Sequence, residues 1–235
     1  MHQANYVVMT GKTADKGKYR RDLALFPIVF NAVGLPIIFL LYAVSPGYYV
    51  DPGTLNTVVL ASLFPPWWGF AFLVIRRLKQ KDVSIKEYIM PRGKFNLLPA
   101  LLLFVLLNFL FDGYMVVALM YGRIPRMTDL HPLQIVFLLL LVPLTAGFTE
   151  ELIWRGYLID ELLSAGNSET KAIIYSSVSF AFIHGFMLFD KLIVTFLFGM
   201  IAGLYYVRQR NLLVLMSTHV AVDVISYALT IFAFG

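Results

Sequence analysis

The chain has 235 residues, of which 59% are hydrophobic and only 14% are charged, whereas an ordinary soluble domain has roughly 25% charged residues. This composition excludes a soluble globular domain, and the absence of cysteine excludes disulfides, thiolate nucleophiles and cysteine-ligated metal sites. The net charge of +5 is typical of the basic loops of a membrane protein, so the lipid bilayer is the expected partner and no nucleic acid is expected.

The first 22 residues form a polar tail with five basic side chains, and a long apolar run follows. No small-residue cleavage site follows that run, which is therefore interpreted as a spanning helix and not as a removed signal peptide. Residues 1–22 are predicted to be a cytoplasmic basic tail.

Several apolar runs reach the ~20 residues that a helix needs to cross a bilayer. The expected spans are residues 23–44, 55–75, 95–120, 133–149, 172–189, 190–207 and 211–232. The fifth and sixth are nearly continuous, which predicts a tight hairpin or a partly re-entrant segment. The prediction is an all-α polytopic bundle of about seven transmembrane helices. It forms a single membrane domain, with amino-terminal helices over 23–132 and a carboxyl-terminal set over 133–232.

The loops alternate in basic content, as the positive-inside rule requires. Loop 76–94 has seven Lys and Arg residues, loop 121–132 has two, and loop 45–54 has none. This alternation predicts a cytoplasmic amino terminus and a carboxyl terminus on the opposite side.

That topology places three polar groups of residues in the cytoplasmic half of the bilayer. Glu150 and Glu151 are expected at the cytoplasmic end of the fourth span, and His219 near the cytoplasmic start of the seventh. His184 is expected deeper, near the middle of its span. Ionisable residues inside a membrane are costly and tend to be functional, so a shared cytoplasmic-facing site is predicted.

The two adjacent glutamates are expected to have different roles. On a helix Glu151 and Arg155 are four residues apart and lie on one face, so they can pair. Glu150 lies about 100° round the helix from Glu151, so it is free to face a cavity as a candidate base. An ordinary salt bridge at an interfacial helix end is the alternative for this motif.

Two further polar groups interrupt the apolar helices. His184 follows Phe180 by one helical turn, and its neutral imidazole can help a glutamate hold a water or can bind a metal. His219 and Asp223 are four apart, so the aspartate can fix the histidine tautomer, or both can line an oxyanion site. The alternatives are a hydrogen-bonded packing histidine at 184 and a polar pair that joins two helices at 219 and 223.

The ordered set Glu-Glu-x-x-x-Arg, Phe-x-x-x-His and His-x-x-x-Asp on three apolar helices resembles the CPBP family of intramembrane proteases, also called the Abi or Rce1-like CAAX protease family. The resemblance covers residues 133–232 and implies peptide-bond hydrolysis in the membrane by a glutamate-activated water. It implies that Glu150 is the general base, that His184 assists in activating the water, and that Glu151 and Arg155 support them.

The resemblance also implies that His219 and position 223 stabilise the tetrahedral oxyanion. The family often has Asn where this chain has Asp223, and an ionised aspartate repels an oxyanion. Either Asp223 is protonated, or it orients His219 and leaves the oxyanion contact to the imidazole; the second is preferred here.

The resemblance implies no cofactor. Zinc held by Glu150, His184 and His219 is the alternative, because two histidines and a glutamate form a known catalytic ligand set. The usual His-Glu-x-x-His spacing is absent.

The leading hypothesis is an intramembrane endopeptidase that cleaves a membrane-associated peptide or protein, in a prokaryotic plasma membrane, with its active site facing the cytoplasm. A proton-coupled transporter and a non-catalytic membrane scaffold or regulator are the alternatives.

Overall fold

A computed structural model describes residues 16–44, 51–90, 96–124, 127, 129–184 and 189–233. Most of the expected basic tail, residues 1–15, lies outside the described residues. Within the described part of the chain every regular element is a helix, so the predicted all-α class is confirmed. The helices are α1 (Lys16–Val44), α2 (Pro52–Lys79), α3 (Ile85–Ile89), α4 (Leu97–Met120), α5 (Pro132–Val136), η1 (Phe137–Leu141), α6 (Val142–Glu150), η2 (Glu151–Leu158), α7 (Ile159–Ser164), α8 (Glu169–Ile183), α9 (Phe189–Gln209), α10 (Leu212–Ala228) and η3 (Leu229–Ala233).

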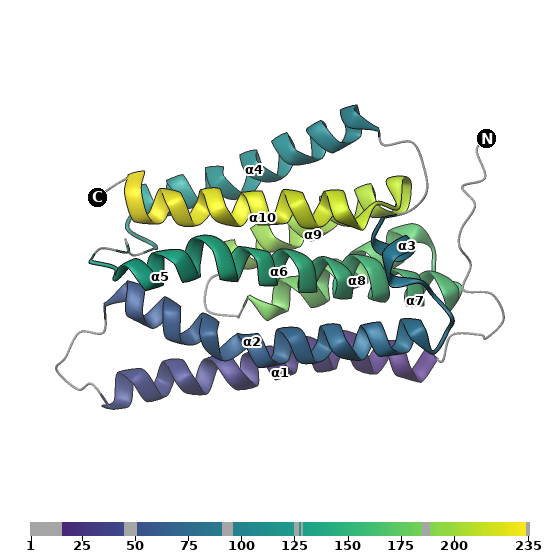
Figure 1. Cartoon of the computed structure of the whole chain (residues 1–235), viewed down its shortest axis with the longest axis horizontal. Coiled ribbons are helices and arrows are strands. Elements are labelled where there is room, and N and C mark those ends of the chain that lie inside the picture. Colours follow the sequence, from purple (N-terminus) through teal and green to yellow (C-terminus); the bar gives the residue numbers. More distant parts are fainter. Residues whose placement is uncertain are drawn as a thin grey trace.

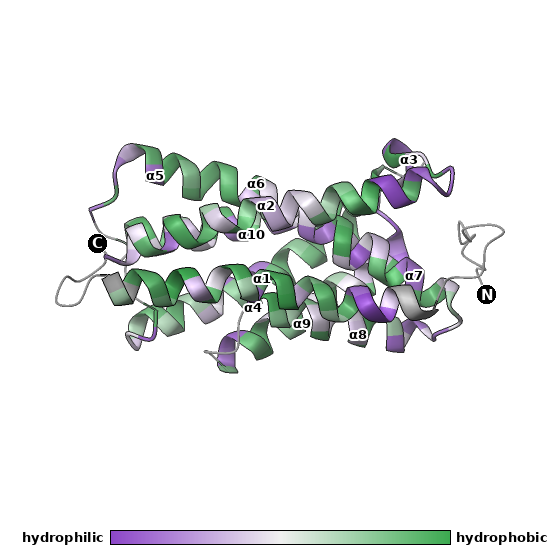
Figure 2. Ribbon diagram, turned by 90° about the horizontal axis from the view of Figure 1, so that it is seen from below, coloured by the Kyte–Doolittle hydropathy of each residue, from purple (hydrophilic) through white to green (hydrophobic). Residues whose placement is uncertain are grey.

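The long helices run along a common direction, and α5, η1, α6, η2 and α7 follow one another as one continuous rod (Figure 1). This rod contacts α2 on one side and α10 on another, while α8 packs against α1 and α9. Hydrophobic residues cover most of the helices, and the strongly hydrophilic ones gather at the end that carries α3 and α7 (Figure 2). The bundle therefore has the surface of an integral membrane protein.

Within the described ranges, six helices are long and apolar enough to cross a membrane. The helix expected over 172–189 is not among them, because α8 has 15 residues and is about 22 Å long, short of the ~30 Å hydrocarbon core. Residues 185–188 lie outside the described part. The expected span 133–149 is too short, since the apolar rod continues to Ser164.

Aromatic side chains from four helices fill the centre of the bundle. Trp154 is fully buried, and its ring lies 6.0 Å from that of Phe26 and 5.9 Å from that of Phe180. Phe30 and Trp67 extend this cluster towards α2, with their ring centroids 6.0 Å apart. Because these rings come from α1, α2, η2 and α8, the amino-terminal helices share one core with the carboxyl-terminal ones.

A buried polar network joins α1, α2 and η2. Arg77 donates to Asp22 at 2.5 Å and to the hydroxyl of Tyr157 at 2.8 Å, and that hydroxyl donates to Asp22 at 3.0 Å. A buried charge needs such partners to offset the cost of its desolvation. The network therefore fixes the position of α1 and α2 against the rod.

A second network is centred on Asp160 of α7. Its carboxylate accepts from the hydroxyls of Tyr88 and Tyr206, each at 2.9 Å, and pairs with Arg210. Burial and the nearby Asp160 carboxylate raise the pKa of the Tyr88 hydroxyl, which therefore stays protonated and can donate. This contact ties α3 and the end of α9 to the rod.

Glycines set the closest helix contacts. A Cβ added at Gly147 would lie 2.6 Å from Val220 Cγ2 and 3.1 Å from the backbone oxygen of Met216, so α6 touches the backbone of α10. Gly199 and Gly203, four residues apart on α9, similarly face α8: a Cβ at Gly199 would lie 2.9 Å from Cβ of Ser177. Small residues at this spacing allow membrane helices to approach closely.

Gly147→Ala is expected to lower the thermal stability of the purified protein in detergent. The added methyl group must push α10 away, and such overpacking costs about 1–3 kcal/mol. Gly113→Ala is the matched control, because an added Cβ there has no neighbour within 4 Å and replacing a helix-interior glycine stabilises by roughly 0.5–1 kcal/mol. Equal shifts of the melting temperature in both variants would contradict the close contact.

Candidate functional site

The candidate site is built on the middle of the rod, where α6 passes into the π-helical segment η2. The wider turn starts at Glu151, and such π-helical segments occur frequently at functional sites. Glu150 and Glu151 are therefore not at the end of a span, as expected from the sequence, but inside a longer one. Their side chains are 3% and 0% exposed, so both carboxylates are removed from solvent.

Glu151 is the most strongly engaged group of the site. Its Oε1 lies 3.0 Å from Nη1 of Arg155, which is the pair that the four-residue spacing predicted. The same oxygen lies 2.7 Å from Nδ1 of His219 on α10. A carboxylate paired with a guanidinium can only accept, so Nδ1 of His219 carries the hydrogen and Nε2 points the other way.

Glu150 has a different environment. Its Oε1 accepts a hydrogen bond from the indole N–H of Trp67 at 2.9 Å, whereas its Oε2 is buried without a partner among the described residues. Oε2 lies 3.8 Å from Nε2 of His219, too far for a direct hydrogen bond. One oxygen is thus fixed by a neutral donor and the other faces the imidazole.

Asp223 lies on the Nε2 side of the same ring. Its Oδ2 is 3.8 Å from Nε2 of His219, and its side chain is 17% exposed. Glu151 makes the short contact to the ring, so the preferred interpretation, in which Asp223 orients His219, stays a prediction. Asp223 faces the nitrogen that also faces Glu150.

His184 lies at the carboxyl-terminal end of α8, where it is the C-cap residue, and not in the middle of a span. Its Nδ1 is 3.2 Å from the carbonyl oxygen of Phe180, one turn earlier. The ring of Phe180 lies 4.9 Å from that of His184 and 6.3 Å from that of His219, so it contacts both imidazoles. The two histidines share an aromatic neighbour from α8.

Two phenylalanines cover the guanidinium of Arg155. The ring centroid of Phe180 lies 3.9 Å from Cζ, and that of Phe198 lies 5.6 Å from it. Such cation–π contacts are strongest when the cation is desolvated, and the Arg155 side chain is 1% exposed. Phe180, the first residue of the Phe-x-x-x-His motif, therefore has a direct physical role. Its ring shields the guanidinium of Arg155, the charge that holds Glu151.

Sequence reasoning missed two residues of the site. Trp67 comes from α2, 83 positions before Glu150, and nothing in its local sequence signals this contact. Lys191, in the first turn of α9, interacts electrostatically with Asp223, Glu150 and His184. An ionisable residue between two apolar runs was the signal that could have identified Lys191.

Among the described residues, no three or more His, Asp and Glu side chains are arranged as a group that could hold a metal ion. The three suggested zinc ligands are spread over the site, with Glu150 on α6, His184 at the end of α8 and His219 on α10.

The carboxyl-terminal part of the chain, residues 132–225, matches the family model described as type II CAAX prenyl endopeptidase Rce1-like. The match confirms the resemblance drawn from the three motifs and indicates a protease. All six candidate site residues fall within the matched range. No curated protein and no solved structure matches the chain.

Arg155→Gln is expected to destabilise the protein strongly, because breaking a buried ion pair costs about 3–5 kcal/mol. The measurement is thermal unfolding in detergent. Arg123→Gln is the control, since the Arg123–Asp190 pair is 56% and 27% exposed and exposed pairs contribute about 0–1 kcal/mol. If both variants have the same melting temperature, the Arg155–Glu151 pair does not hold the site.

Proposed function

We propose that the Rce1-like part of the chain, residues 132–225, forms the centre of an intramembrane endopeptidase that hydrolyses a peptide bond with a glutamate-activated water. The observation that carries this proposal is the division between the two glutamates. Oε1 of Glu151 is held by Arg155 and His219, whereas Oε1 of Glu150 accepts from the neutral Trp67. Oε2 of Glu150, unpartnered among the described residues like Oε2 of Glu151, faces Nε2 of His219.

In the proposed reaction Oε2 of Glu150 removes a proton from a water molecule as the water oxygen attacks the carbonyl carbon of the scissile bond. A tetrahedral intermediate forms, with the negative charge on the former carbonyl oxygen. As the carbon–nitrogen bond breaks, Glu150 returns its proton to the leaving nitrogen, so the site ends in its starting state. General acid–base catalysis of this kind contributes about 10²–10⁴-fold to a rate.

His219 is the proposed donor to the oxyanion. When protonated, its Nε2 donates towards the space beside Glu150, while Glu151 balances the charge through Nδ1. A donor held in place before the reaction stabilises a developing negative charge well. His184 is proposed to help hold the attacking water from the end of α8.

Asp223 would repel the oxyanion if its charge were uncompensated. Lys191 interacts electrostatically with Asp223, and we propose that it neutralises the extra charge that Asp brings where the family often has Asn. Lys191 and Asp223 together then present a neutral pair to the reacting atoms.

The proposed orientation places the α3/α7 end of the bundle in the cytoplasm. That end carries the carboxyl ends of α2 and α9, which basic residues follow in the sequence, whereas α4, which Arg123 follows, ends at the opposite side of the bundle (Figure 1). The positive-inside rule favours this arrangement. His219 is seven residues into α10 from that end, about 10 Å of helix, so the site is proposed to face the cytoplasmic side. The substrate is proposed to be a membrane-associated peptide or protein.

Glu150→Gln is expected to abolish peptide cleavage, since the amide cannot accept the proton of the water. The assay compares membrane proteins of cells that express wild type or variant, and a precursor should accumulate in the variant. Glu87→Gln, on the exposed helix α3, is the control and should process the precursor normally. Equal processing by wild type and Glu150→Gln would refute the proposed base.

The same cleavage, repeated with purified protein and a metal chelator, is expected to proceed at an unchanged rate. Water activation by Glu150 requires no metal ion in this mechanism. A loss of activity that added zinc restores would favour the alternative in which Glu150, His184 and His219 bind zinc.

Trp67→Phe is expected to lower the cleavage rate about tenfold without unfolding the protein. The phenyl ring preserves the apolar packing but loses the N–H that fixes Oε1 of Glu150, and a hydrogen bond to a charged group contributes about 1.5–3 kcal/mol. Trp68→Phe is the matched control, because Trp68 is half exposed and stacks on Phe148. Equal rates in the two variants would show that Trp67 does not position Glu150.

A further inference from the structure

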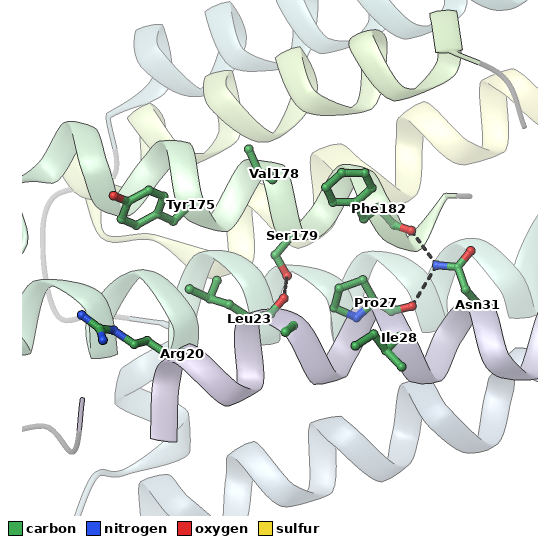
Figure 3. A pocket seen from close by; sticks show the side chains of 10 residues that line it. Arg20, Leu23, Pro27, Ile28, Asn31, Tyr175, Val178, Ser179 and Phe182 are labelled. Carbon is green, nitrogen blue, oxygen red and sulfur yellow. Dashed lines mark hydrogen bonds between the residues drawn. The ribbon is translucent and has the colours of Figure 1, made fainter. Parts of the chain in front are cut away.

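A groove of about 580 Å³ runs along the outside of the bundle between α1 and α8, on the side away from α10 (Figure 3). Its walls are almost entirely apolar and include Leu23, Pro27, Ile28, Val178 and Phe182. Ile28 is 60% exposed and Val178 39% exposed, so the groove is open to the surroundings of the helix. In a membrane this surface faces lipid.

Two polar side chains within the groove, Asn31 and Ser179, are satisfied by the protein itself. Asn31 uses its amide group to donate to the carbonyl oxygens of Pro27 at 2.8 Å and Phe182 at 2.7 Å. Ser179 donates to the carbonyl oxygen of Leu23 at 2.7 Å and accepts from Trp154 at 3.1 Å. The middle of the groove and the end formed by Asn31 and Phe182 therefore favour an apolar ligand.

The other end has a different character. Arg20 and Tyr175 lie together there, opposite the end formed by Asn31 and Phe182 (Figure 3). Among the described residues neither Arg20 nor Tyr175 makes an ion pair or a hydrogen bond through its side chain. Arg20 also lies at the start of the first membrane-spanning segment, Tyr19–Leu41, where the interface with the headgroups is expected. The groove thus has a positive, hydrogen-bonding end at the interface and an apolar path into the bilayer.

The length of the groove identifies its ligand. From residue 20 to residue 31 a helix rises about 16 Å, which is about half of the ~30 Å hydrocarbon core. One leaflet has this thickness, so one acyl chain fits along the groove, whereas a spanning helix of another protein would extend well beyond it. A guanidinium at the outer end is suited to a phosphate group.

From this geometry we propose that the groove binds an anionic phospholipid, with its phosphate at Arg20 and Tyr175 and one acyl chain between α1 and α8. The lipid would cover the contact by which Asn31 holds the carbonyl of Phe182, two residues before His184. A bound lipid would therefore stabilise the position of the end of α8 that carries His184.

The test is native mass spectrometry of the full-length protein in detergent, with equal concentrations of dioleoyl phosphatidylglycerol and dioleoyl phosphatidylcholine. Wild type is expected to retain the anionic lipid preferentially. Arg20→Gln should lower this preference about fivefold, the effect of one basic residue at an anionic surface. Arg21→Gln is the matched control, since it removes the same charge one residue away but does not line the groove, and it should leave the preference unchanged.

Two further measurements separate the chain from the headgroup. Ala24→Phe fills the middle of the groove and should reduce retention of both lipids, with an unchanged melting temperature as evidence of folding. Inorganic phosphate at the same concentration should not displace the anionic lipid. The proposal is overturned if Arg20→Gln behaves like Arg21→Gln, if Ala24→Phe retains both lipids, or if phosphate alone displaces them. None of these readouts depends on proteolysis.

Discussion

The site depends on a single carboxylate oxygen, Oε1 of Glu151, which contacts both Arg155 and His219. Both contacts are buried. Solvent therefore cannot replace Arg155 as the positive partner of Glu151, and it cannot replace Glu151 as the group that orients His219. Phe180 covers the guanidinium and contacts the imidazole. With Nδ1 of His219 held by Glu151, the other nitrogen of the ring, Nε2, faces Glu150 and Asp223.

The amino-terminal helices carry no family motif, yet they complete the site. Trp67 reaches Glu150 from α2, and the Asp22–Arg77–Tyr157 network holds α1 and α2 against the rod. The matched range, residues 132–225, therefore does not contain all the side chains that contact the two glutamates. The chemistry of the carboxyl-terminal helices relies on packing supplied by the rest of the chain.

Local patterns in the sequence predicted what depends on local geometry. The all-α class and the Glu151–Arg155 pair both follow from composition and helical spacing. The Trp67 contact could not be predicted, because it joins residues 83 positions apart. The predicted fourth span, residues 133–149, is too short. The hydropathy falls at Glu150, although that residue is buried inside the rod. α8 ends at Ile183 and makes His184 a helix cap, although the apolar run predicted a helix that continues past it.

The π-helical segment that begins at Glu151 fits more residues into each turn than an α-helix does. Side chains before it and within it face different neighbours: Gly147 faces α10, while Trp154 faces the core formed by α1 and α8. Removing one residue from this stretch would let it wind as a regular α-helix with the downstream residues close to their present faces, whereas removing one from the α-helical part of the rod would turn everything downstream by about 100°. Chain length in the α-helical part of the rod is thus as strict a requirement as residue identity, whereas the wide turn is the place where one residue can be lost with the least change of face.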